Sequence, residues 1–395
     1  MADELKRKIG LKLLTAYGVG VMVGAGIYVL VGAVAAEAGV WAPLAFLLAG
    51  VIAAPTALSY AEFSTRIPEA AGEAAYVAKG FAAPWLAVLV GLAIVLAGTV
   101  SAAAVLRGGA GYLTAISALP FVPTVIILGA VLAFVAVVGV LESLWLAAVF
   151  TIIEVFGLGL VVWAGFSVAP VEAFTTPQPI VWVGVSSAAV LAFFAFIGFE
   201  DIVNMAEEVD NPVRVLPRAI LYSLLITTLL YALVTFAAVR AVPLNMLGNS
   251  EQPLALVWTQ AHGGSAVFLS LIAVAAALNG VLAQIVMASR VLFGLGRRTA
   301  GLAMFHHTHA RFGTPVLGTV LVGFGVVLGA LMLPVADLAE VTSGLLLSVF
   351  VLVNAALIVL KRSEPEAPFR VSMAVPLFGL IASLAALGIT IGAKL

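Results

Sequence analysis

Apolar runs of about 20 residues recur along the whole of this 395-residue chain, and they constrain its fold more than any other feature. A helix needs about 20 mostly apolar residues to cross the hydrocarbon core of a lipid bilayer. When charges, prolines and glycine clusters are taken as boundaries, about eleven runs qualify as membrane spans. They cover, in order, Leu13–Glu37, Trp41–Ala61, Trp85–Leu106, Val122–Leu141, Ser143–Ser167, Trp182–Met205, Pro217–Val239, Ser265–Gly296, Pro315–Leu333, Asp337–Leu360 and Val375–Ala393. The sequence therefore predicts an all-α membrane protein with about eleven transmembrane helices.

The composition excludes most other classes of protein. Hydrophobic residues make up 64% of the chain and charged residues only 9%, against about 45–50% and about 25% in ordinary soluble domains. A soluble enzyme of this length would lack the polar surface to cover itself, and 18 Lys and Arg against 19 Asp and Glu give no basic excess for binding nucleic acid. The absence of cysteine excludes disulfides, thiol chemistry and Cys-built metal sites. We expect neither a cofactor nor a metal site.

The positions of lysine and arginine predict the orientation in the membrane. With the N-terminus in the cytoplasm, 15 of the 18 Lys and Arg residues fall on the inner side, and only Arg107, Arg240 and Lys394 fall on the outer side. In membrane proteins the cytoplasmic loops carry the excess of positive charge. The sequence thus predicts a multi-pass protein of the cell membrane with a cytoplasmic N-terminus, and an odd number of spans places the C-terminus outside.

Two of the predicted spans contain residues that interrupt a helix. The first has four glycines within residues 18–26, and each glycine costs about 1 kcal/mol relative to alanine inside a helix. Close packing against a neighbouring helix explains this cluster equally well, because Gly20 and Gly24 have the spacing of a small-residue packing face. The sixth span sets Gly198 and two acidic residues into the aromatic stretch 193–201, and this second interruption favours a true break in both helices.

Two interrupted helices that lie five spans apart and enter the membrane from opposite sides are typical of transporters built from an inverted repeat. The breaks free backbone N–H groups at the positive end of a half-helix, which can hold a carboxylate, and C=O groups, which can hold an ammonium group or a cation. This pairing fits a zwitterion such as an amino acid. We expect a single transmembrane transporter domain over residues 1–395, with a first repeat at about 13–167, an inverted second repeat at about 182–360 and an extra helix at about 375–393.

The residues around the breaks also carry a family resemblance that extends over nearly the whole chain. The matching stretches are Val23–Tyr28, Tyr60–Glu62, Arg66–Tyr76, Phe193–Glu200, Ala206–Pro212, Leu216–Ile220 and Ala288–Phe293. In them the chain resembles the amino acid–polyamine–organocation (APC) transporter superfamily, most closely its cationic-amino-acid-transporter-like branch. It departs from the family pattern at Ala71, where glycine is usual, and in having about eleven spans where many members have twelve.

The resemblance implies a fold of two five-helix inverted repeats with discontinuous first and sixth helices. It also implies alternating access, in which a bundle of spans 1, 2, 6 and 7 rocks against spans 3, 4, 8 and 9. The substrate-binding residues carried over by position are Met22, Gly24, Ala25, Gly26 and Ile27 in the first span and Phe194, Ala195, Phe196, Ile197, Gly198 and Glu200 in the sixth. Phe194 takes the position of an aromatic gate that closes over the substrate from outside.

Two carboxylates within the spans are candidates for function, because an unpaired charge at the bilayer centre costs several kcal/mol. Glu200 follows the second break; in related polyamine and arginine transporters a glutamate at this position touches substrate or responds to pH. Its structural alternative is to cap the half-helix that follows.

Glu154 lies in the middle of the fifth span, where sodium-independent relatives often have a lysine that replaces a sodium ion. The opposite charge excludes that lysine mechanism, so we expect Glu154 to take part in proton coupling, with a structural hydrogen bond as the alternative.

The function expected from these features is secondary active transport of amino acids, with proton coupling as the first hypothesis and amino acid or polyamine exchange as the alternative. The expected substrate is a small molecule, an amino acid, with a cationic amino acid or a polyamine left open. The other expected partners are a coupled proton and the lipid bilayer. A membrane-embedded enzyme would need a nucleophile and base or metal ligands, yet the predicted spans contain no histidine and no cysteine. A channel would need charged rings or a repeated filter loop, and the sequence has neither. We therefore expect no catalytic residues, and the sequence does not determine the substrate or the oligomeric state.

Overall fold

The computed structural model describes residues 9–67, 72–139, 144–206 and 208–392. Within these ranges the chain is built from helices, and the single isolated β-bridge pairs Ile9 with Val209. The α-helices are α1 (Leu11–Val23), α2 (Ala25–Ala38), α3 (Ala42–Arg66), α4 (Gly72–Phe81), α5 (Pro84–Ser117), α6 (Phe121–Val138), α7 (Leu144–Ser167), α8 (Glu172–Thr175), α9 (Trp182–Phe193), α10 (Pro212–Ala241), α11 (Leu244–Gly248), α12 (Pro253–His262), α13 (Val267–Arg298), α14 (Val316–Met332), α15 (Val335–Ser363) and α16 (Ala374–Gly392). Four 3₁₀ helices join them: η1 (Gly39–Trp41), η2 (Phe194–Phe196), η3 (Glu200–Met205) and η4 (Ala300–Phe305).

Eight helical segments in the described part of the chain are long and apolar enough to cross a membrane. Three shorter apolar helices accompany them, at Leu11–Val23, Val316–Met332 and Ala374–Thr390. Large apolar side chains such as Ile127, Phe134 and Ile152 are exposed on the outside of these helices, a surface that is stable in lipid and not in water. The prediction of an all-α membrane protein is therefore confirmed.

The third predicted span is too short, because it ends at Leu106, just before the charge of Arg107. The structure instead continues α5 to Ser117. The Arg107 guanidinium donates a hydrogen bond to the Ala330 carbonyl at 2.8 Å and lies 5.1 Å from the centre of the Phe121 ring. A long cationic side chain that finds partners on neighbouring helices does not end a membrane helix.

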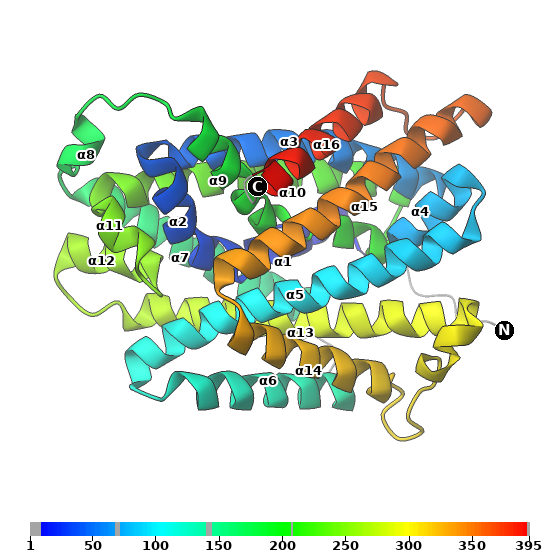
Figure 1. The fold of residues 1–395 in the computed structure, drawn as a ribbon, viewed down its shortest axis with the longest axis horizontal. Helices are drawn as coiled ribbons and strands as arrows, with labels where there is room; N and C mark the ends of the chain where they lie inside the picture. Colours follow the sequence, from blue (N-terminus) through cyan, green and yellow to red (C-terminus); the bar gives the residue numbers. More distant parts are fainter. Residues whose placement is uncertain (1–8, 68–71, 140–143, 207, 393–395) are drawn as a thin grey trace.

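The interrupted segments lie in the interior of the helix assembly. Figure 1 shows α5 and α13 side by side, with α14 and α6 packed next to them. On the other side, α3 packs against α9, α10 and α16, while α15 contacts both α5 and α16. Between these groups the pair α1–α2 meets α9, η2 and η3, and α7 and α10 pack against α1. The fold thus brings the two predicted breaks, which are far apart in the sequence, into contact.

Candidate functional site

The first break lies at a single residue, Gly24. Helix α1 ends at Val23 and α2 begins at Ala25, and Gly24 between them has φ −22° and ψ −164°. The Gly24 N–H still donates to the Gly20 carbonyl at 3.0 Å, so the break follows the last turn of α1 directly. No side chain caps the start of α2 and its first turn holds no acidic residue. The predicted interruption of the first span is therefore confirmed.

The other glycines of this span serve helix packing. A Cβ on Gly18 would overlap Ile202 and Ser223, and a Cβ on Gly20 would overlap the Thr151 hydroxyl. Closer to the break, a Cβ on Gly26 would lie 3.1 Å from the Cα atom of Ala195. The two explanations of the glycine cluster therefore both hold, at different residues, since Gly18 and Gly20 permit close packing and Gly24 interrupts the helix.

The second break is longer and contains a side-chain hydrogen bond of its own. After α9 the chain forms η2, turns at Ile197–Phe199 and continues as η3. Gly198 has φ +122°, a conformation that only glycine adopts without strain, and a Cβ there would lie 2.6 Å from Val21 Cγ1. The Glu200 carboxylate accepts a hydrogen bond from the Gly198 N–H at 3.0 Å. This hydrogen bond lies within the turn of the second break, whereas η3 itself has no side-chain cap, so the predicted capping of the following half-helix by Glu200 is not observed.

A tyrosine that the sequence analysis did not single out joins the two breaks. The Tyr231 hydroxyl, on α10, lies 2.6 Å from the Met22 carbonyl oxygen and 2.9 Å from the Ala195 carbonyl oxygen. Its side chain is completely buried. Met22 belongs to the last turn of α1 and Ala195 to η2, so one hydroxyl contacts a backbone carbonyl from each interrupted segment.

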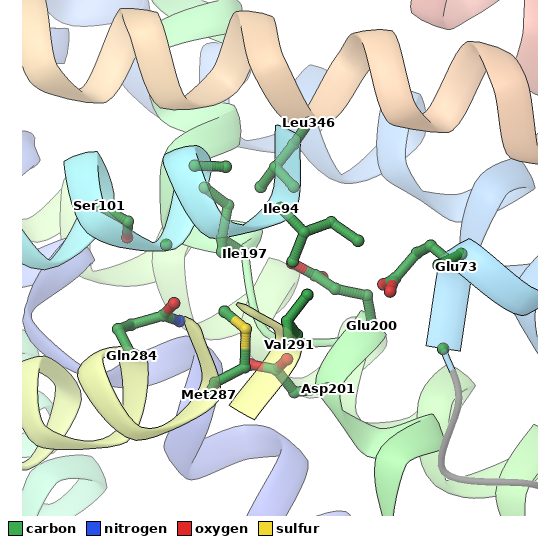
Figure 2. A pocket seen from close by; sticks show the side chains of 14 residues that line it. Glu73, Ile94, Ser101, Ile197, Glu200, Asp201, Gln284, Met287, Val291 and Leu346 are labelled. Carbon is green, nitrogen blue, oxygen red and sulfur yellow. The ribbon is translucent and has the colours of Figure 1, made fainter. Parts of the chain in front are cut away.

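A small cavity of about 70 Å³ adjoins the second break. Figure 2 shows Glu73 and Glu200 next to one another at one end of it, Asp201 below them beside Met287, and Ser101 and Gln284 at the other end. None of the described residues that line the cavity is a lysine, arginine or histidine. The lining residues are Gly72, Glu73, Ala74, Ile94, Ala97, Gly98, Ser101, Ile197, Glu200, Asp201, Gln284, Met287, Val291 and Leu346. The cavity is therefore mostly apolar, with an acidic end.

Two of these carboxylates are deeply buried and accept few hydrogen bonds. The exposed fractions of Glu73 and Glu200 are 8% and 6%, and the Tyr60 hydroxyl donates to Glu73 Oε1 at 3.2 Å. Glu73 belongs to α4, outside the membrane-crossing helices. Burial raises the pKa of the Glu73 carboxyl above its ordinary value of 4.5, and hydrogen bonds from its own backbone and from Tyr60 offset only part of that rise. A negative charge at the acidic end of the cavity therefore costs free energy, and a bound cation would reduce that cost.

Only part of the predicted substrate site lines this cavity. Ile197 and Glu200 do, whereas the other predicted residues do not. Those others surround the contact between the breaks: Met22, Gly24, Ala25, Gly26 and Ile27 on one side and Phe194, Ala195, Phe196 and Gly198 on the other. Phe194 is 4% exposed, and its Cδ1 atom would lie 3.7 Å from a Cβ on Gly26. Its role as a gate stays a prediction.

Glu154 lies beside the first break, not in the cavity. It belongs to α7 and is only 2% exposed. The Tyr28 hydroxyl donates to the backbone carbonyl of Glu154 at 2.9 Å, and the Glu154 carboxyl interacts electrostatically with the phenol groups of Tyr28 and Tyr231. A titratable group is thus placed next to the segment that the first break interrupts, and its part in proton coupling stays a prediction.

Comparison with known proteins identifies relatives that match nearly the whole of this chain, including both breaks. The family described as "Amino acid permease" matches residues 9–394. The branched-chain amino acid permease BcaP of Bacillus subtilis is 30% identical over 391 residues, which cover 92% of this chain and 83% of the relative. The Arabidopsis thaliana cationic amino acid transporter 3, mitochondrial, is 32% identical, with 92% of this chain and 64% of the relative covered. The methylthioribose transporter of Bacillus subtilis is 28% identical, with 97% of this chain and 87% of the relative covered. The chain therefore spans less than two thirds of the plant relative's length but most of both bacterial ones.

Proposed function

Because the chain belongs to the amino acid permease family, we propose that it carries an amino acid across the cell membrane by alternating access, coupled to a proton. The family is one of membrane transporters, so the chain is not an enzyme. The observation that supports the proposal most strongly is the meeting of two interrupted helices in the interior, where Tyr231 contacts a carbonyl from each. Helix breaks expose backbone groups that lipid cannot satisfy, so they are retained where they bind something.

The substrate backbone is proposed to bind between the breaks. The uncapped N–H groups at the start of α2, at Ala25–Ile27, suit the substrate carboxylate, because the positive end of the helix dipole lies there. The carbonyls at the end of α1 and in η2 suit the ammonium group. The start of α2 would thus hold the carboxylate of a zwitterion, and the carbonyls at the end of α1 and in η2 would hold its ammonium group.

The substrate side chain is proposed to extend into the cavity beside the second break. Apolar residues such as Ile94, Ile197 and Met287 line most of it, and Glu73, Glu200 and Asp201 form its acidic end. A long aliphatic side chain that ends in a cation fits this lining. The name of the plant relative, a cationic amino acid transporter, agrees with that choice, whereas the name of the bacterial permease points to branched-chain substrates.

The orientation proposed from the sequence places this cavity on the cytoplasmic side. Its acidic end adjoins α4, which follows the end of α3 that carries Arg66. Positively charged helix ends of this kind face the cytoplasm. Glu154, buried beside the first break, is the proposed proton carrier, and we place the N-terminus inside the cell and the C-terminus outside.

Uptake into proteoliposomes tests the proposal. We expect a pH gradient to drive the accumulation of labelled arginine or leucine, and Glu154→Gln to abolish that accumulation. Glu172→Gln makes the same chemical change at an exposed residue of α8 and serves as the matched control. Flux that occurs only with substrate on both sides would show an exchanger and overturn proton symport. A tenfold rise in uptake on adding sodium at fixed pH would overturn the proton as the coupling ion.

A further inference from the structure

A groove runs between α6 and α14, which lie side by side at the edge of the helix assembly (Figure 1). Its volume is about 640 Å³, within the range of about 300–1,000 Å³ that small-molecule sites have. Every residue that lines it belongs to one of these two helices and has an apolar side chain or none. The groove is therefore separate from the cavity beside the second break, and it opens toward the lipid.

Small residues allow the two helices that form the groove to approach closely. A Cβ on the buried Gly323 would lie 2.7 Å from the Ala133 Cβ, and a Cβ on the buried Gly129 would overlap Val327. By contrast, the side chains of Phe134 and Phe324, which also line the groove, are 66% and 65% exposed. An acyl chain in such a groove has protein atoms on several sides and gains more dispersion contacts than it would on a flat helix face.

One end of the groove is joined to a loop that carries an exposed arginine. This end is formed by the last turn of α6, with Val137, and by the first turn of α14, with Val316. The Thr314 hydroxyl donates to the Val137 carbonyl at 2.5 Å, which fastens the segment before α14 to α6. Just before this segment, the Gly313 N–H donates to the His309 carbonyl at 2.8 Å, and the turn that this bond closes presents Arg311 to the outside.

The sequence that forms this end of the groove has positive charges and no acidic residue. Residues 252–336 include no aspartate or glutamate, but they include four arginines and all four histidines of the chain, and α6 has no charged residue. Two of the arginines, Arg290 and Arg297, are exposed in the last turns of α13, which packs against α14. Arg311 forms no ion pair with the described residues. Glu142, four residues after the end of α6, lies outside the described residues.

We propose that this groove binds an anionic phospholipid, with one acyl chain between α6 and α14 and the phosphate group beside Arg311. Arginine forms charge-assisted hydrogen bonds with phosphate oxygens, and basic residues at the ends of membrane helices attract anionic headgroups. A second copy of the chain suits this face less, because copies in one membrane share their orientation. A two-fold pair would therefore place two positively charged ends side by side.

Two substitutions test the two halves of the site separately. Arg311→Gln removes the charge, and Ala130→Phe fills the groove from an exposed position that lines it. The matched controls are Arg218→Gln, at an exposed residue of α10, and Ala385→Phe, at an exposed residue of α16. Native mass spectrometry of the full chain in detergent measures the dissociation constants of three probes. These are phosphatidylglycerol, phosphatidylcholine with the same acyl chains, and glycerol 3-phosphate, which is a headgroup without acyl chains.

The expected results differ among the lipids and the variants. The wild type binds phosphatidylglycerol about tenfold more tightly than phosphatidylcholine and does not bind glycerol 3-phosphate measurably. Arg311→Gln weakens the binding of phosphatidylglycerol about fivefold, the effect of one basic residue near an anionic lipid, and leaves phosphatidylcholine unchanged. Ala130→Phe weakens the binding of both lipids about tenfold, because the acyl chain loses apolar contact. Both controls stay within about twofold of the wild type.

Four outcomes would overturn the inference. Equal affinities for the two phospholipids would show no selection of the headgroup, and equal losses in a variant and its matched control would show a general effect of surface charge or bulk. Binding of glycerol 3-phosphate as tight as that of phosphatidylglycerol would show an anion site without a lipid. A dimer that Ala130→Phe dissociates and Ala385→Phe does not would show that a second copy occupies the groove. Because no transport is measured, failure of the proposed function leaves this test unaffected.

Discussion

Two sets of buried carboxylates near the same end of α3 differ in what surrounds them. Glu62 is completely buried and lies between two cations: Arg66 at 2.7 Å and Lys361 at 2.6 Å. It also accepts the Val371 N–H at 2.9 Å. Glu73 and Glu200, in the cavity, have no cation in contact among the described lining residues, and their hydrogen-bond donors include Tyr60 and Gly198, respectively.

The difference distinguishes a carboxylate whose charge is balanced within the fold from carboxylates that we propose bind the substrate. The Glu62 network joins α3 to α15 and to the segment before α16, because Lys361 also donates to the Val371 carbonyl at 2.7 Å. Its charge is fully compensated, so nothing remains for a ligand. The cavity carboxylates destabilise the empty protein through their mutual repulsion and their burial, and such a cost is retained where it serves a substrate.

The largest effect is expected on removing a cation from the Glu62 network. Lys361→Met removes the charged donor of Glu62 Oε2 and of the Val371 carbonyl in a completely buried place, and we expect a loss of about 2–3 kcal/mol in stability. Thermal unfolding in detergent measures it. The control is Lys79→Met, whose exposed ion pair with Glu364 at 3.3 Å contributes at most about 1 kcal/mol. Equal unfolding midpoints for the two variants would remove the distinction between paired and free carboxylates.

A smaller effect, of another kind, is expected at Glu200. Glu200→Gln keeps an oxygen that can accept the Gly198 N–H, so the hydrogen bond within the break is retained and the unfolding midpoint stays within a few degrees of the wild type. The lost charge weakens the transport of a cationic amino acid by about tenfold in kcat/KM, the effect of one charge-assisted hydrogen bond. Unchanged arginine transport together with a large loss of stability would show that Glu200 has only a structural role in the break.

The smallest effect is a pH dependence of stability that arises from Glu73. The folded protein raises the pKa of this carboxyl above 4.5 through burial, so it holds the proton more tightly than the unfolded chain does. The resulting stabilisation is present below pH 4.5 and is lost as the pH rises through the raised pKa. We expect the unfolding midpoint of the wild type, relative to that of Glu73→Gln, to fall from mildly acidic to neutral pH. Parallel curves for the two proteins would show that Glu73 does not titrate in this way.

Sequence reasoning identified the features that depend on neighbouring residues. Membrane spans follow from apolar runs, and the two helix breaks follow from glycines within them, because a helix depends on contacts only three or four residues away. The glycine at position 198 is required by its positive φ angle. The membrane fold and both interruptions were therefore predictable, and the division of the glycines between packing and breaking was not.

The features that sequence reasoning missed join residues that are distant in the chain. Glu62 and Lys361 are 299 positions apart, and the cavity is lined from α4, α5, η3, α13 and α15. The rotation of each helix decides such pairs, and a single sequence does not give it. One pattern in the sequence could have identified Tyr231: the polar residues at 223, 227 and 231 lie on one face of a membrane helix.

The central claim is that the two breaks and the adjoining cavity form the binding site of an amino acid permease. A structure of the protein with a transported amino acid bound tests it most directly. We expect the substrate carboxylate within hydrogen-bond distance of the N–H groups at Ala25–Ile27 and the side chain directed toward Glu200. An amino acid bound in contact with neither break would contradict the account.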